Sequence, residues 1–123
     1  MDYGTLRALL LSKPGATEDF PFGPEDAVAK VGGKMFALMG VQDPPTSIIL
    51  KCDPDYAREL RTEYPAITTA PYMSKQHWNA VALDGTVPDE MLLSLIDDSY
   101  HLVVKGLTRK QREELDLSNT PDV

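Results

Sequence analysis

The chain has 123 residues, of which 42% are hydrophobic and 25% are charged, and its net charge is −7. These values fit one globular domain and exclude an extended disordered chain. The acidic balance counts against a protein that holds nucleic acid only through non-specific phosphate contacts, because such binding needs a basic surface. No apolar run reaches the ~18 residues of a membrane-spanning helix, so we expect a cytoplasmic monomer without membrane contact.

Apolar periodicity and turn residues predict four helices and four strands. The caps Asp2, Asp53 and Thr108 begin three of the helices, and the acids Asp89 and Glu90 occupy the first turn of the longest one. We expect Arg61 to lie on the solvated face of the second helix. The predicted helices are at 2–13 and 53–64, from a start within 87–90 up to 106, and at 108–115. The predicted strands are at 27–31, 34–41, 46–52 and 78–83.

The clearest local signal is Gly32-Gly33, which accepts the positive φ angles of a two-residue hairpin turn. Its register predicts Ala29 opposite Phe36 and Ala27 opposite Leu38. Strands joined by so tight a turn are antiparallel. The predicted class is therefore α+β, an antiparallel sheet with helices packed on it.

Two further segments are predicted as loops. One contains Glu18-Asp19 and Glu25-Asp26, with Phe20 and Phe22 expected to anchor it to the core. The other contains residues 68–71. No internal repeat or linker interrupts the chain, which indicates a single domain at 1–117 and a frayed tail at 118–123.

The chain offers few residues for catalysis or metal binding. Cys52 could form a nucleophile pair with His77 or His101, but it alternates in phase with the apolar residues of its strand, which favours a buried structural thiol. A single cysteine also excludes an intramolecular disulfide and fits a reducing compartment. Asp97 and His101 stand four residues apart, as in a surface helix contact. We expect no catalytic residue, metal or cofactor, and no enzyme activity.

The first candidate binding surface combines cationic, aromatic and amide side chains within five residues, which could stack on a base and bond to it. The alternative places the tryptophan as a core anchor and the other side chains in a structural or solvated role. Its members are Lys75, His77, Trp78 and Asn79.

The second candidate surface holds four of the 12 basic residues and no acid. Local positive potential attracts anions even on an acidic protein. The preference of cations for the carboxyl end of a helix explains the same residues without any ligand. Its members are Lys105, Arg109, Lys110 and Arg112.

Several motifs in the chain resemble the MmcQ/YjbR family of small bacterial proteins. They are found in the expected order across residues 1–116: residues 14–23 (PGATEDFPFG), 30–37 (KVGGKMFA), 50–54 (LKCDP), 75–79 (KQHWN), 83–85 (LDG) and 99–107 (SYHLVVKGL). The resemblance implies a double-wing α+β domain, similar to the DNA-binding domain of a phage transcription activator. Family members are commonly described as DNA-binding through that fold similarity, with no established enzyme activity or cofactor. Ser74 and Gln76 stand where an asparagine and a basic residue are expected.

Three functions follow from these patterns. A DNA-binding module would use both candidate surfaces. A protein-interaction module would use the same residues to hold an acidic partner. A small-molecule-binding domain would need a pocket near His77, Asn79 and Asp19.

Overall fold

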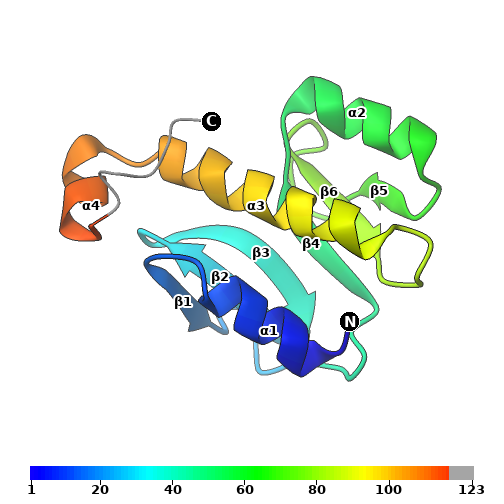
Figure 1. Ribbon diagram of the computed structural model, residues 1–123, viewed down its shortest axis with the longest axis horizontal. Coiled ribbons are helices and arrows are strands. Elements are labelled where there is room, and N and C mark those ends of the chain that lie inside the picture. Colours follow the sequence, from blue (N-terminus) through cyan, green and yellow to red (C-terminus); the bar gives the residue numbers. More distant parts are fainter. Residues whose placement is uncertain (117–123) are drawn as a thin grey trace.

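The computed structural model describes residues 1–116 and consists of a six-stranded antiparallel sheet with helices packed on one face (Figure 1). The strand order is β1-β2-β3-β4-β6-β5. The elements are α1 (Tyr3–Leu11), β1 (Ala16–Asp19), β2 (Asp26–Val31), β3 (Lys34–Gly40), β4 (Ser47–Lys51), α2 (Pro54–Glu63), β5 (Ile67–Thr69), β6 (Trp78–Ala82), α3 (Asp89–Lys105) and α4 (Arg109–Glu114). The predicted α+β class is confirmed. The expected domain end at 117 and the tail at 118–123 lie outside the described residues.

The core fills the inner face of the sheet, beneath the helices. Ile67, Val81, Ile48 and Met39 form one row across four strands and are all buried. Leu6 and Leu10 of α1, Ala57 and Leu60 of α2, and the long stripe of α3 complete the same cluster. Burial of this apolar surface is the main favourable contribution to folding.

The predicted helix caps and the hairpin turn are present. The Asp2 carboxylate accepts a hydrogen bond from the Thr5 amide at 2.7 Å, and the Asp53 carboxylate accepts one from the Tyr56 amide at 3.2 Å. Thr108 forms a capping box with Gln111. Gly32 and Gly33 have φ angles of 60° and 78°, as a primed two-residue turn requires.

The sheet consists of two three-stranded halves, β1-β2-β3 and β4-β6-β5, joined by the β3–β4 pair. That pair has only three aligned positions, from Ala37 opposite Leu50 to Met39 opposite Ile48. Beyond it, the buried Ser99 hydroxyl of α3 accepts a hydrogen bond from the Lys51 amide at 2.8 Å and donates one to the Phe36 carbonyl. A helix side chain thus connects the strands where their ladder ends.

Both outermost strands were predicted as loops, and this prediction is wrong. β1 pairs with β2, and β5 pairs with β6, but these strands have only four and three residues. Strands of three or four residues are too short to show a clear alternation of apolar and polar residues. Their extended conformation is instead determined by pairing with the neighbouring strand.

The predicted hairpin register is also wrong at both Ala29 and Ala27, although Val31 faces Lys34 next to the turn, as that register requires. The pairing shifts between Ala29 and Lys30, so that Ala29 faces Ala37 and Ala27 faces Met39. Phe36 is the extra residue on β3. Its ring packs edge-on against Tyr100 of α3, with the ring centroids 5.3 Å apart. Packing under α3 therefore overrides the simple alternation of the hairpin.

Two predicted side-chain positions differ as well. Phe20 and Phe22 do not anchor their loop to the core, since both are exposed. The Asp97 carboxylate pairs with Lys13, which follows α1. His101 bonds the Asp97 backbone carbonyl through Nδ1, at 2.9 Å, and its ring packs edge-on against Tyr100. The contact predicted from their spacing is therefore a side-chain-to-backbone one.

Candidate functional site

The two predicted surfaces lie in different parts of the molecule. Residues 75–79 precede and begin β6, beside α2. The stretch at 105–112 covers the end of α3 and most of α4, and Figure 1 places α4 at the opposite end of the molecule from α2, β5 and β6. The structure therefore does not combine them into one binding surface.

Two of the four cations of the α4 surface are paired with acids of the same helix. Arg109 pairs with Glu113 at 3.1 Å, and Lys110 pairs with Glu114 at 4.0 Å. Such exposed pairs, four residues apart, are weak but lower the local potential. The exposed Lys105 ends α3, and the half-buried Arg112 lies in the last turn of α4, where helix dipoles favour cations.

The other surface gains a cation that the sequence analysis missed. Lys51, the last residue of β4, lies directly opposite Trp78, the first residue of β6. Both side chains point to the outer face of the sheet, away from α3. Lys75 and His77 are exposed on the loop that leads into β6. We call Lys51, Lys75, His77 and Trp78 the Trp78 cluster.

Backbone hydrogen bonds hold this loop against the sheet. The amides of His77 and Trp78 donate to the Ser74 carbonyl at 3.3 and 3.1 Å, forming a tight turn. The Cys52 amide donates to the His77 carbonyl at 2.7 Å and extends the pairing of β4 with β6 by one residue. The cluster is thus built on ordered backbone next to a strand.

Asn79 supports the cluster from inside the protein. It is 3% exposed, and its amide nitrogen donates to the Ala57 carbonyl at 3.4 Å. Its side-chain oxygen accepts a 2.6 Å hydrogen bond from Arg61, whose guanidinium also donates to the Lys75 carbonyl at 3.2 Å. Asn79 and Arg61 therefore position the loop, and neither matches its predicted role at the surface. The alternation of β6 already indicated this, because Asn79 is in phase with the buried Val81.

The cations around the cluster have no acidic partners in the described part of the chain. Within residues 1–116, no carboxylate forms a salt bridge with Lys51, Arg61 or Lys75. Six other cations do have such partners, namely Arg7, Lys13, Lys30, Arg58, Arg109 and Lys110. Lys34 and Lys105 likewise have no carboxylate partner among these residues, so uncompensated positive charge lies both where β6 begins and where α3 ends.

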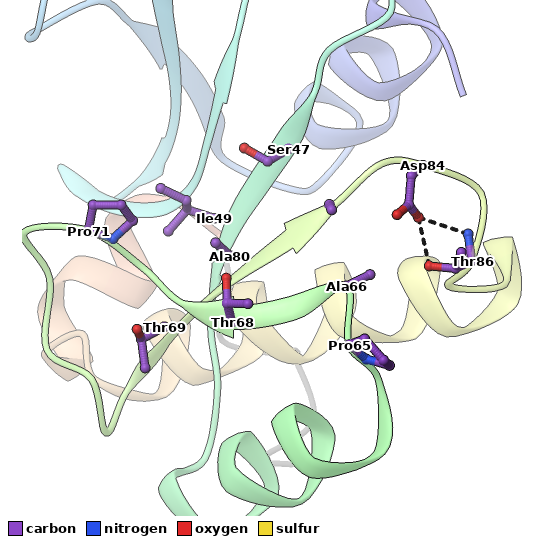
Figure 2. A pocket seen from close by; sticks show the side chains of 11 residues that line it. Ser47, Ile49, Pro65, Ala66, Thr68, Thr69, Pro71, Ala80, Asp84 and Thr86 are labelled. Atoms are coloured by element: carbon purple, nitrogen blue, oxygen red, sulfur yellow. Dashed lines mark hydrogen bonds between the residues drawn. The ribbon is translucent and has the colours of Figure 1, made fainter.

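An apolar groove lies on the same outer face, next to the cluster. It consists of two hollows of about 610 and 490 Å³ that share Ile49 and Pro71. Figure 2 shows the larger hollow, with Ile49 and Pro71 at one end and Asp84 and Thr86 at the other. Met35, Leu38, Tyr72 and other residues line the smaller one.

No hydrogen bond joins Cys52 to the His77 or His101 side chains among residues 1–116. Cys52 borders a hollow of about 130 Å³ together with Asp98 and His101. Burial raises the pKa of the Cys52 thiol to about 11, and the carboxylates of Asp98 and Asp53 add to the shift. The thiol is therefore protonated at neutral pH and is a poor nucleophile. Its predicted identity as a buried free cysteine is confirmed.

Residues 1–116 contain neither a three-residue cluster of metal ligands nor a membrane-spanning helix. No three side chains of His, Cys, Asp or Glu type gather closely enough to hold a metal ion. None of the helices in this part of the chain is both long enough and apolar enough to cross a bilayer.

Comparison with known proteins identifies the family. The model of the YjbR family matches residues 11–102. The chain belongs to the YjbR family. It is 35% identical to the uncharacterized Escherichia coli protein YbdF, over 90% of this chain and 91% of the relative. It is 29% identical to the uncharacterized E. coli protein YjbR, over 94% and 98% of the two chains. The family resemblance noted in the sequence is confirmed.

Solved structures of YjbR-like proteins share this fold. The crystal structure of Deinococcus radiodurans DR2400, whose domain is described as DUF419, superposes with a TM-score of 0.85 at 42% identity and covers 97% of this chain and 88% of its own. A crystal structure of a Pseudomonas syringae protein superposes with a TM-score of 0.70 at 28% identity, covering 83% and 98%. These likenesses establish family and fold and leave the activity open.

Proposed function

We propose that this YjbR-family protein is a non-enzymatic binding module that contacts DNA through the Trp78 cluster. The observation that carries the proposal is that Lys51 and Lys75, neither of which forms a salt bridge in the described residues, flank the half-buried Trp78 on an otherwise acidic protein. Lys51 and Lys75 would neutralise phosphates, and Trp78 offers an aromatic surface beside them. The DNA-binding description attached to the family resemblance agrees with this choice.

The size of the cluster limits the expected strength of binding. Two lysines can neutralise about two phosphates, so the logarithm of the binding constant should fall with the logarithm of salt concentration with a slope of about −2. The net charge of −7 opposes close approach of a long polyanion. We therefore expect weak binding that is measurable at low salt.

Trp78, the only tryptophan of the chain, supplies the readout. Its fluorescence is followed while a short DNA duplex is added at several salt concentrations. Lys75→Glu should weaken binding by at least about tenfold. Lys110→Glu removes another exposed lysine, from α4, and should have little effect. No binding at low salt, binding that salt does not weaken, or equal losses in the two variants would each contradict the proposal.

An acidic protein segment is the second candidate ligand of the same cluster. The overall charge of −7 favours it, because a short acidic segment brings less negative charge toward the protein than a duplex does. Native purification of the tagged chain should then recover a stoichiometric acidic partner. Lys75→Glu should release that partner, whereas Lys110→Glu should retain it. Failure to recover any such partner would count against this alternative.

A further inference from the structure

The apolar groove on the outer face of the sheet has no role in the proposed contact with DNA. Its floor is a row of side chains across neighbouring strands, including Leu38 of β3, Ile49 of β4 and Ala80 of β6. These residues are half-buried, although the helices cover only the opposite face. The groove is therefore an apolar surface without a covering element in the described part of the chain.

Two exposed aromatic residues flank the groove. Phe22 comes from the loop between β1 and β2 and is 66% exposed, and Tyr72 comes from the loop between β5 and β6 and is fully exposed. Both line the smaller hollow. Large aromatic side chains held in water beside an apolar hollow are typical of binding surfaces.

The backbone of Tyr72 supplies independent support. Its φ angle is 62°, in the left-handed region that a non-glycine residue adopts at a cost of about 1–2 kcal/mol. The side chain is fully exposed, so burial of the ring does not offset this cost. Strained backbone is frequently found at ligand-binding sites.

The charges of the groove indicate what kind of ligand it accepts. The only charged side chains that line the two hollows are Asp26 in the smaller and Asp84 in the larger. Asp84 accepts hydrogen bonds from the Thr86 amide and hydroxyl at 3.0 and 2.6 Å, and these bonds lower its pKa and keep it ionised. Figure 2 shows this pair at the end of the larger hollow that is remote from Pro71. A complementary ligand is apolar in the middle and cationic toward its ends.

The length of the groove distinguishes a peptide from a small molecule. Its lining residues come from β2, β3, β4, β6 and β5, and five neighbouring strands span about 19 Å. An extended chain covers about 3.3 Å per residue, so about six residues cross this span. A compact metabolite would fill only one hollow.

We propose that the groove binds an extended segment of a partner protein, about six residues long, with apolar side chains against Ile49 and Leu38 and cationic side chains near Asp26 and Asp84. The segment crosses the strands and is held between Phe22 and Tyr72. This binding surface is separate from the Trp78 cluster, although the two adjoin, and it requires no DNA.

A phage-displayed library of random octapeptides tests the proposal on the full chain. Selected peptides should combine an apolar centre with lysine or arginine near the ends. Tyr72→Gly should weaken their binding by at least about tenfold, because it removes an aromatic contact. It should also leave the fold at least as stable, because glycine adopts positive φ freely. Leu93→Ser, which removes an exposed apolar side chain from α3, is the matched control and should bind normally.

Several outcomes would overturn the proposal. The first is a selection that yields acidic peptides. The second is peptides that bind the Tyr72→Gly variant with the same affinity as they bind the wild type. The third is a selection in which no peptide is enriched relative to a selection on an unrelated protein. A wild-type dimer that Tyr72→Gly converts to a monomer in sedimentation experiments would assign the groove to a second copy of this chain instead. Loss of DNA binding in Lys75→Glu with retained peptide binding would separate this site from the proposed DNA contact.

Discussion

The two faces of the sheet are built from similar residues but have different surroundings. Ile48 points inward and is fully buried under α3, while the next residue, Ile49, points outward into the groove and is half-buried. Met39 and Leu38 of β3 show the same contrast. Apolar character on the inner face is explained by packing. On the outer face nothing in the described fold requires it, which favours a binding role for that face.

The largest expected effect on stability comes from truncating a core side chain on the inner face of the sheet. Phe36→Ala should lower the free energy of unfolding by about 3–5 kcal/mol, since it empties a fully buried site against Tyr100. Leu38→Ala, on the outer face of the same strand, should lower it by about 1 kcal/mol. Urea denaturation of both variants measures the difference. Similar losses would mean that the outer face is also part of the stabilising core.

An intermediate effect is expected from the polar residue on the inner face of β6. Asn79→Ala should destabilise the protein by about 2 kcal/mol, because Arg61 and the Ala57 carbonyl lose their partner in a buried setting. Ala80→Ser changes the neighbouring outward residue and should alter stability by less than about 0.5 kcal/mol. Thermal unfolding compares the two. If Ala80→Ser lowers stability more than Asn79→Ala does, the assignment of Asn79 to the inner face and Ala80 to the outer face of the sheet is wrong.

A further effect concerns pH. The raised pKa of Cys52 means that the folded state holds the thiol proton more tightly than the unfolded state does. This contribution to stability is complete below pH 9.0 and is lost as the pH rises from 9.0 to about 11. Across that interval the wild type should lose more stability than Cys52→Ala, as measured by urea denaturation. Equal losses would show that the thiol titrates normally in the fold.

Much of the fold could be predicted because its signals are local. The caps at Asp2, Asp53 and Thr108 and the turn at Gly32-Gly33 each depend on a few adjacent residues. The edge strands β1 and β5 and the register shift at Phe36 depend on pairing and on packing under α3, which no short window contains. These features were therefore missed.

The candidate site divides in the same way. Lys75, His77 and Trp78 are close in the sequence and were found together. Lys51 joins them only through the pairing of β4 with β6, and Arg61 reaches the loop from α2. The apolar groove could not be predicted at all, because the alternation of apolar residues along a strand does not show which face of the sheet is left uncovered by helices.

The hydroxyl of Ser99 joins the two halves of the sheet from the side opposite the groove, because it bonds both the Phe36 carbonyl and the Lys51 amide. We expect its removal to loosen the junction of β3 and β4, whose outward residues Leu38 and Ile49 form part of the groove floor. A single interior side chain is thereby linked to the shape of a surface that it does not line.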